Sequence, residues 1–236
     1  MSTYIEDIAK GPHYEVLKTD AIASSDLQFK VVIVGDSGCG KTSLFNSYIR
    51  GSFPKEYEPT IFENHRSFVQ RQSSKLEVLS ADLWDTAGQE EYERLRRLSY
   101  QDADLVVIAY NINAPESLSN IPDVWAIETM TYAPNAKIIL VGLKSDMPHQ
   151  VNPDLSFKMA KDIGAVAHLQ VSALMGENID VIFDCVFNTI YNKTRQNQKL
   201  IQQRQSGSHS KNNGSSQKIK FKNKNKDKKK RKCVIL

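Results

Sequence analysis

Continuous apolar runs along the chain predict strands that are buried on both faces of a sheet. The runs lie at 29–35, 104–112 and 136–144, with a shorter one at 165–174. Runs of this kind, rich in Val and Ile, are typical of parallel sheets that carry helices on both sides. A further pair of segments, 65–72 and 75–84, has the composition of an antiparallel hairpin whose second strand is partly buried.

Stretches with helical periodicity alternate with these runs. They lie at 41–49, 91–100, 115–132, 154–163 and 177–194. Strands that alternate with helices predict an α/β fold of three layers, because the crossover helices cover both faces of a parallel sheet. We therefore expect a mostly parallel six-stranded sheet with one antiparallel edge hairpin and helices on both faces.

Composition divides the chain into three parts. Residues 1–26 are polar and without a clear period, which indicates a disordered N-terminal extension. Residues 27–203 have the length of one ordinary domain. From 204 to 236 the chain consists mainly of Gln, Ser, Asn, Gly and Lys, a composition that cannot bury a core, and we expect a disordered tail there.

The charge of the chain is concentrated in that tail. The net charge is +4, but residues 218–232 contain ten Lys or Arg and one Asp, which leaves about −5 for the rest. The three cysteines are odd in number and widely spaced, which argues against a disulfide framework or a zinc site and fits a reducing cytosol. No apolar run approaches 18 residues and the N-terminus lacks an apolar signal core, so we expect neither a membrane span nor secretion.

A glycine-rich segment follows the first apolar run without a gap. "GDSGCGKT", Gly35 to Thr42, matches G-x-x-x-x-G-K-[ST] in full, between a predicted strand and a predicted helix. In this context the backbone N–H groups surround phosphate oxygens, Lys41 reaches the β- and γ-phosphates and the Thr42 hydroxyl is placed for Mg²⁺. The alternative is a glycine turn without a ligand. We predict a P-loop NTPase-type fold, with phosphate bound by Asp36, Ser37, Gly38, Cys39, Gly40, Lys41, Thr42 and Ser43.

A second motif, "LWDTAGQEEYERLRRLSY", begins at Leu83. Asp85 ends a predicted strand, where a second carboxylate can hold Mg²⁺ through water. Gly88 offers an unobstructed N–H, and Gln89 can orient a water molecule for attack on a phosphate. The two motifs together predict a nucleotide hydrolase.

Both motifs, together with "YEPTIFEN" at 57–64, "SAL" at 172–174 and the final "CVIL", resemble small GTPases of the Ras superfamily, most closely the Rho family. The resemblance covers about residues 28–192 and the last four residues. It implies that Phe53 lies against the base, that Tyr57 closes over the phosphates and that Thr60 binds Mg²⁺ and the γ-phosphate in the GTP state. It also implies the remaining site residues: Lys144, Asp146, Ser172, Ala173 and Leu174 at the guanine; Gln89, Lys41 and Thr60 in catalysis; Thr42, Thr60 and Asp85 at Mg²⁺; and Tyr57, Glu58, Pro59, Thr60, Ile61, Phe62, Glu63 and Asn64 as the effector surface.

The function that this resemblance implies is a membrane-anchored GTP/GDP switch that hydrolyses GTP and recruits effectors in the GTP state. The implied partners are an exchange factor, a GTPase-activating protein, a dissociation inhibitor and effectors such as kinases or actin regulators, in actin organisation or cell polarity. We expect a monomer that binds no nucleic acid.

The ending "CVIL" has a cysteine four residues from the end and a final Leu, which predicts geranylgeranylation of Cys233. The preceding basic residues supply the second signal that stable anchoring needs, since each adds on the order of 1 kcal/mol at an anionic leaflet. We therefore expect the cytoplasmic face of the plasma membrane, with a cytosolic pool. The alternative is a solvated basic tail or a patch for nuclear import or nucleic acid.

Three departures from the Rho pattern leave alternatives open. Leu143 stands where these proteins have Asn or Thr and cannot hydrogen-bond to the phosphate loop. Only 25 residues separate Asp146 from Ser172, too few for the Rho insert helix. Ser37 gives the loop the Rab-like form G-D-S-G, and its side chain faces the γ-phosphate position. The alternatives are a constitutively GTP-bound, hydrolysis-poor interaction module, a P-loop ATPase or kinase, and a Rab-like trafficking protein.

Overall fold

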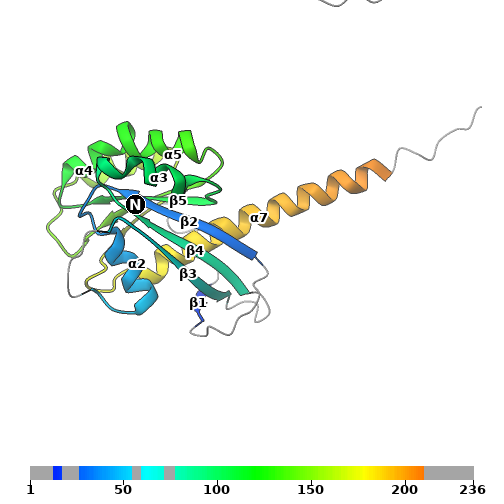
Figure 1. The fold of residues 1–236 in the computed structure, drawn as a ribbon, viewed down its shortest axis with the longest axis horizontal. Helices are drawn as coiled ribbons and strands as arrows, with labels where there is room; N and C mark the ends of the chain where they lie inside the picture. The colour runs from blue at the N-terminus through cyan, green and yellow to red at the C-terminus, as the bar shows by residue number, and fades with distance from the viewer. Residues whose placement is uncertain (1–12, 18–26, 55–59, 72–77, 210–236) are drawn as a thin grey trace, which may run out of the picture. The chain divides into compact units, whose positions relative to one another are not determined.

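A seven-stranded sheet forms the centre of the fold (Figure 1). The computed structural model describes residues 13–17, 27–54, 60–71 and 78–209. In the order β1-β3-β4-β2-β5-β6-β7, strands β4, β2, β5, β6 and β7 pair in parallel, while β3 is antiparallel to β4 and to β1. The strands are β1 (Tyr14–Val16), β2 (Leu27–Gly35), β3 (Phe62–Arg71), β4 (Val78–Thr86), β5 (Leu105–Asn111), β6 (Lys137–Leu143) and β7 (Ala167–Val171). The predicted mostly parallel sheet with an antiparallel hairpin is confirmed.

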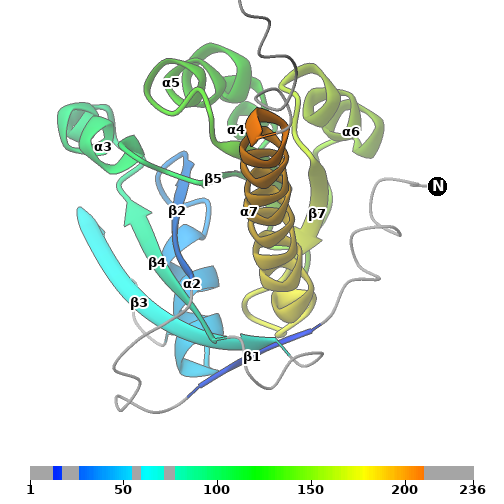
Figure 2. The same ribbon diagram turned by 90° about the vertical axis from the view of Figure 1, so that its right-hand side faces the viewer.

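Helices cover both faces of the sheet (Figure 2). They are α2 (Lys41–Arg50), η1 (Glu90–Tyr92), α3 (Glu93–Tyr100), α4 (Pro115–Asn120), η2 (Ile121–Trp125), α5 (Ala126–Tyr132), α6 (Pro153–Asp162) and α7 (Ile179–His209). In β2, Val31 and Ile33 pack with α2 and α7, whereas Val32 and Val34 pack with α4, α5 and α6. Because alternate side chains point to opposite faces and helices cover both, the part of β2 from Val31 to Val34 is apolar at every position.

The sheet has one strand more than the six that the sequence predicts. The additional strand, β1, lies in the segment 1–26 that was expected to be disordered, and it pairs with the outer edge of β3, with Tyr14 opposite Arg71. The hairpin β3–β4 is therefore not at the edge of the sheet. A three-residue strand has too little periodicity to be recognised in a sequence, and only its contacts with β3 and α7 stabilise it.

The contacts of β1 with α7 centre on Asp184. Its Oδ2 lies 2.5 Å from Nδ1 of His13, and its Oδ1 accepts a 2.9 Å hydrogen bond from the backbone N–H of Tyr14. The ring of Tyr14 packs on Phe187 at a centroid distance of 5.3 Å. One carboxylate on α7 thus binds two groups at the start of the strand.

We expect Asp184→Ala to lower the free energy of unfolding by about 1–3 kcal/mol, because it leaves a half-buried N–H and a ring nitrogen without an acceptor. Urea unfolding followed by circular dichroism measures the change. Asp180→Ala, an exposed carboxylate one turn earlier on α7, is the control. Equal unfolding midpoints for the two variants would contradict the role given to Asp184.

The predicted helix 115–132 contains a π-helical turn. In η2 the N–H of Ala126 bonds to the carbonyl of Ile121, five residues back. Pro122 is the cause: it has no N–H, and its ring would clash with the carbonyl four residues before it in a regular α-helix. Trp125 ends this turn, and Glu128 follows it in the first turn of α5.

Helix α7 continues past the predicted domain boundary at 203 to His209. The chain divides into two units, residues 1–195 and 196–236, and the part of α7 that packs on the sheet belongs to the first. Among the helices that the structure describes, none combines the length and the apolar character that crossing a membrane requires.

A half-buried histidine gives the fold a pH dependence. Nε2 of His168 on β7 lies 3.0 Å from the hydroxyl of Tyr110 on β5, above Gly142 of the intervening strand β6, where a Cβ would lie 2.7 Å from that hydroxyl. Burial lowers the pKa of His168 from 6.5 to about 4. Since the folded pKa lies below the unfolded one, the unfolded chain binds more protons between pH 6.5 and 4.

We therefore expect His168 to reduce the free energy of unfolding as the pH falls through this window, by about 3 kcal/mol in total. Urea unfolding of the wild type and of His168→Gln from pH 7 to 4 measures it. The difference between the two proteins isolates the histidine, because Asp85 and Asp184, whose pKa values are raised by burial, contribute equally to both. A difference that does not change with pH would contradict the prediction.

Candidate functional site

A tight loop joins the end of β2 to the start of α2. Gly35 has a φ of 145°, and a Cβ there would lie 2.2 Å from the carbonyl oxygen of Ala109. Gly40 has a φ of 110°, in the region that favours glycine. No side chain caps the N-terminus of α2, so its first N–H groups and the helix dipole face the loop. This geometry suits an anion.

The side chain of Lys41 lies beneath the loop. It is 5% exposed, and its Nζ donates hydrogen bonds to the carbonyls of Gly35 at 2.8 Å and Asp36 at 2.9 Å. A buried ammonium group is far from solvent screening, so it attracts a nearby phosphate more strongly than an exposed lysine does. The loop and Lys41 together form a phosphate-binding site.

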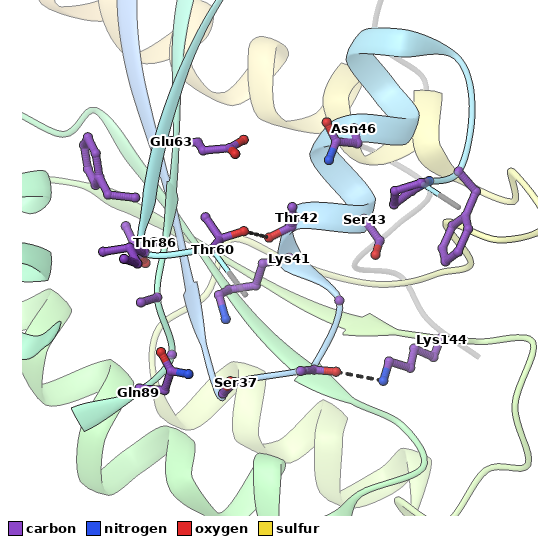
Figure 3. Close-up of a pocket in the computed structure, with 18 of the residues that line it drawn as sticks. Ser37, Lys41, Thr42, Ser43, Asn46, Thr60, Glu63, Thr86, Gln89 and Lys144 are labelled. Atoms are coloured by element: carbon purple, nitrogen blue, oxygen red, sulfur yellow. Dashed lines mark hydrogen bonds between the residues drawn. The ribbon is translucent and has the colours of Figure 1, made fainter. Parts of the chain in front are cut away.

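A cavity of about 880 Å³ opens above this loop (Figure 3). Its size lies within the range of small-molecule sites. Of the predicted residues, the lining contains Ser37, Gly38, Gly40, Lys41, Thr42, Ser43, Phe53, Thr60, Ile61, Phe62, Glu63, Gly88, Gln89 and Lys144. Asn46, Arg50, Pro54, Thr86 and Ala87 complete it. The sequence did not predict these five residues as part of the site, because none of them stands at a motif position that has a known chemical role.

Two hydroxyl groups meet at one end of the cavity, and a buried carboxylate outside its lining interacts with one of them. The hydroxyls of Thr42 and Thr60 lie 2.8 Å apart (Figure 3). Asp85, at the end of β4, is 1% exposed, and among the described residues no group lies in hydrogen-bond geometry to either of its carboxylate oxygens. Burial raises the pKa of Asp85 to about 6, although Thr42 and Lys41 act in the opposite direction. A buried carboxylate without a partner indicates a cation that would bind there.

The donor set suits Mg²⁺. Among the residues that the structure describes, no group of three or more His, Cys, Asp or Glu could hold a metal. Mg²⁺ needs no such group, because it binds through one or two carboxylates and keeps several waters and phosphate oxygens. Thr42, Thr60 and Asp85 fit this pattern, with hard oxygen donors only.

The loop that follows β4 contacts the phosphate loop directly. A Cβ on Gly88 would lie 2.2 Å from the backbone nitrogen of Ser37 and 2.5 Å from the carbonyl oxygen of Gly35, so only glycine fits. The N–H of Ala87 donates to the carbonyl of Ile61 at 3.1 Å, which joins this loop to the segment before β3. Two segments far apart in sequence thus meet at the phosphate loop, with Gln89 on the cavity wall.

A second cluster lies beyond Lys144, after β6. Lys144 has a φ of 64° and donates from Nζ to the carbonyl of Gly38 at 2.8 Å. Lys144 therefore supplies the hydrogen bond to the phosphate loop that its neighbour Leu143 cannot make. The Leu143 side chain is buried and lies 3.7 Å from the position of a Cβ on Gly40.

Asp146 is exposed, and Ser172 orients it: the Ser172 hydroxyl donates to Oδ1 of Asp146 at 2.5 Å. The backbone of Ser172 is fixed by reciprocal hydrogen bonds with Glu177, at 3.1 and 3.0 Å. The carbonyl of Ala173 accepts from Ser47 of α2 at 3.3 Å. None of the four predicted guanine-binding residues Asp146, Ser172, Ala173 and Leu174 belongs to the cavity lining, whereas Lys144 does. Asp146 is two residues from Lys144 in the sequence, and Ser172 is joined to Asp146 by a hydrogen bond. A carboxylate held in this way can accept hydrogen bonds from a base.

Several predicted residues have other environments. The carboxylate of Asp36 does not face the cavity: it accepts hydrogen bonds from Trp125 at 2.7 Å and Asn120 at 2.8 Å. Any contact of Asp36 with phosphate is therefore made by its backbone. Cys39 is 2% exposed, and burial raises the pKa of its thiol. Tyr57, Glu58, Pro59 and Cys233 lie outside the described residues.

The described part of the predicted effector surface is Thr60 to Asn64, around the start of β3. Thr60 is half-buried, and Ile61, Phe62, Glu63 and Asn64 are exposed. The ring of Phe62 stands edge-on to Trp84 at 5.1 Å, and Glu63 pairs with His65 at 3.0 Å. Ile61 and Phe62 are exposed apolar residues beside the carboxylate of Glu63, and a protein partner can recognise such a surface.

Comparison with known proteins gives a consistent result. The sequence profile of the Ras family matches residues 30–192. GTP-binding protein RHO4 of Saccharomyces cerevisiae is 42% identical over 186 residues, which cover 76% of this chain and 62% of that protein. A GTP-binding RHO-like protein of Candida albicans is 38% identical over 213 residues, 86% of this chain and 61% of that protein. GTP-binding protein RHO2 of Saccharomyces cerevisiae is 42% identical over 171 residues, 68% of this chain and 88% of that protein.

The first two of these relatives are longer than the region they share with this chain, which spans 62% and 61% of their lengths. The shared region contains both sequence motifs and the whole cavity lining. The site geometry and the comparisons therefore concern the same part of the chain.

Proposed function

This chain belongs to the Ras family of small GTPases, within the Rho group, and from this premise we propose that it is a GTP/GDP switch that hydrolyses GTP to GDP and phosphate. The observation that carries the proposal is the meeting of two segments at the phosphate loop. Thr60 bonds to Thr42, and Gly88 lies against Ser37. A γ-phosphate at this point would contact both segments, and its removal would release both.

Each residue of the site has a role in this reaction. The ammonium of Lys41 and the N–H groups of the phosphate loop neutralise the charge that develops on the γ-phosphoryl oxygens. Gln89 orients the attacking water, and the N–H of Gly88 holds a γ-phosphate oxygen. Thr42, Thr60 and Asp85 would hold Mg²⁺, which supplies further charge neutralisation between the phosphates. Asp146 would select guanine over adenine, because it accepts hydrogen bonds where adenine offers no donor.

The proposal is tested by the nucleotide itself. The purified protein is denatured, the released nucleotide is identified by chromatography, and phosphate release from bound GTP is followed in a single turnover with and without Mg²⁺. We expect GDP or GTP in the released fraction and Mg²⁺-dependent phosphate release. Bound ATP, or no uptake of guanine nucleotide by folded protein, would contradict the proposal.

A second candidate is a GTP-bound interaction module without useful hydrolysis. The observation that favours it is Ser37, which is exposed on the cavity wall beside Gly88. In this position its side chain can obstruct an arginine supplied by an activating protein. Such an arginine accelerates hydrolysis by about 10³–10⁵-fold. Ser37→Gly separates the candidates: a large gain in activated hydrolysis supports the module, and an unchanged rate supports the working switch.

We also propose that the switch acts at a membrane. The support is the sequence "CVIL" at 233–236 after a run of basic residues. Its partners would be an exchange factor, an activating protein, a dissociation inhibitor and effectors, and the effectors would bind at Ile61 to Asn64. The process in which it acts would be actin organisation or cell polarity. Fractionation of cells expressing the wild type and Cys233→Ser tests the anchor: equal membrane fractions would contradict lipidation.

A further inference from the structure

A buried arginine lies beside the loop that carries Gln89, although no nucleotide role is assigned to it. Arg96 on α3 is 3% exposed. Its Nε and Nη2 donate to the two carboxylate oxygens of Glu128 on α5, at 3.0 and 2.8 Å. Its Nη1 donates to the carbonyls of Ala87 at 3.0 Å and Gln89 at 2.9 Å. All three nitrogens of the guanidinium are therefore engaged.

The two carbonyls that Arg96 binds lie on either side of Gly88. A single nitrogen that bonds to both fixes the backbone between them. That backbone contacts the phosphate loop, where the space at Gly88 is too small even for a methyl group. The direction in which the Gln89 side chain leaves the backbone therefore depends on where the Arg96 guanidinium lies.

The position of the guanidinium depends in turn on Glu128. Glu128 is 8% exposed, and its Oε2 also accepts a hydrogen bond from the hydroxyl of Tyr100 at 3.1 Å. The guanidinium carbon lies 4.8 Å from the centre of the Trp125 ring. The Trp125 Nε1 donates to Asp36 in the phosphate loop at 2.7 Å. One helical segment, 120–128, thus contacts the loop that carries Gln89 through Arg96 and the phosphate loop through Trp125.

A buried ion pair is a poor way to stabilise a fold, because the desolvation of two charges offsets their attraction, and apolar side chains of similar size often do better. The pair Arg96–Glu128 has a geometric property that apolar residues lack. Its planar guanidinium presents the NH2 group of Nη1 to two carbonyls in a fixed direction. This property serves the loop that it binds.

We propose that Arg96 and Glu128 are a positioning pair for Gln89: Glu128, which does not line the nucleotide cavity, holds Arg96 so that the backbone at 87–89 places Gln89 to orient the water that attacks the γ-phosphate. The inference rests on the proposed GTP hydrolysis and deepens it. It assigns the alignment of the water-orienting glutamine to a carboxylate on α5, 39 residues away in the sequence.

The test compares Glu128→Gln with Asp82→Asn. Both change a carboxylate to an amide in an arginine pair; Asp82 on β4 binds Arg66 at 2.6 and 3.0 Å, away from the cavity. We expect single-turnover GTP hydrolysis by Glu128→Gln to fall about 10- to 100-fold, since misplacement of a reacting group by about 1 Å costs up to 10²-fold. Affinity for GDP should change by less than about threefold, because the pair touches none of the phosphate-loop atoms. Asp82→Asn should hydrolyse GTP as the wild type does.

A double mutant separates positioning from a general structural role. In a Gln89→Leu background the glutamine is absent, so Glu128→Gln should cause no further loss of hydrolysis. An equal fractional loss in both backgrounds, or an unchanged rate in Glu128→Gln itself, overturns the proposal. If Glu128→Gln does not fold, Tyr100→Phe, which removes only one hydrogen bond to Glu128, takes its place, with an expected loss of about threefold.

A readout that needs no hydrolysis distinguishes this proposal from the proposed function. Amide hydrogen exchange of the segment 86–92 in the GDP-bound protein should become at least about tenfold faster in Glu128→Gln and stay unchanged in Asp82→Asn, because the carbonyl contacts that order the segment are weakened. Equal exchange in the two variants overturns the positioning pair. A wild-type protein that binds GTP and releases no phosphate counts against the proposed hydrolysis alone.

Discussion

Replacement of Gly88 by alanine is expected to reduce GTP hydrolysis about 100-fold or more. The new Cβ would lie 2.2 Å from the nitrogen of Ser37, 2.4 Å from the carbonyl carbon of Asp36 and 2.5 Å from the carbonyl oxygen of Gly35. All three are backbone atoms, which cannot rotate away. One of the two loops must therefore move by roughly 1 Å, and such a displacement of a reacting group costs about 10²-fold in rate.

The loop at 87–89 is the one expected to move, because the phosphate loop is held between β2 and α2. GDP affinity should therefore fall much less than the hydrolysis rate. Single-turnover phosphate release and titration with a fluorescent GDP measure the two quantities. Gly164→Ala is a suitable control: Gly164 has a positive φ, 69°, and none of the described residues around it lies within 4 Å of the added methyl. It should lower stability by about 1 kcal/mol and leave hydrolysis intact. Wild-type hydrolysis by Gly88→Ala would contradict the contact between the two loops.

Replacement of Lys41 by methionine is expected to weaken nucleotide binding about 10²-fold or more. Methionine has a similar length but removes a buried charge, and the loss of one partner from a buried charged contact costs about 2–5 kcal/mol. The carbonyls of Gly35 and Asp36 also lose their hydrogen bonds to Nζ. Titration with fluorescent GDP measures the affinity, and thermal unfolding shows whether the fold is retained.

Lys137→Met, an exposed lysine at the start of β6, has the same chemical change away from the cavity and should bind nucleotide normally. If Lys41→Met bound GDP as tightly as the control, the buried ammonium would have no part in phosphate binding. The phosphate loop would then act through its backbone alone.

The parts of the site that the sequence predicts best are contiguous in it. The strand, the glycine loop and helix α2 follow one another within Leu27–Arg50, so their geometry depends on neighbours along the chain. The same is true of the segment from Asp85 to Gln89. Gly35, Gly40 and Gly88 are required by backbone angles and close contacts, and these requirements appear directly as glycines in the motif.

Features that join distant segments were not predictable in this way. The strand β1 pairs with residues 69–71 and binds Asp184, and neither contact leaves a periodic pattern at 14–16. Asp36 was predicted to bind the nucleotide, and the structure shows that its carboxylate instead accepts a hydrogen bond from Trp125, a residue 89 positions away in the sequence. Arg96 lies within the second motif, but the motif does not indicate its partner Glu128, which is 32 residues away.

What the sequence determined by itself is the fold class and the chemistry of the phosphate loop, because both follow from local patterns: strands without polar positions, helical periods, and glycines beside a single lysine. What only the tertiary structure decided is which side chains face the cavity and which hold its loops in place. Those assignments depend on atoms that folding brings together from β1, α3, α5 and α7. The sequence pattern does not indicate which atoms of these distant segments come close to one another.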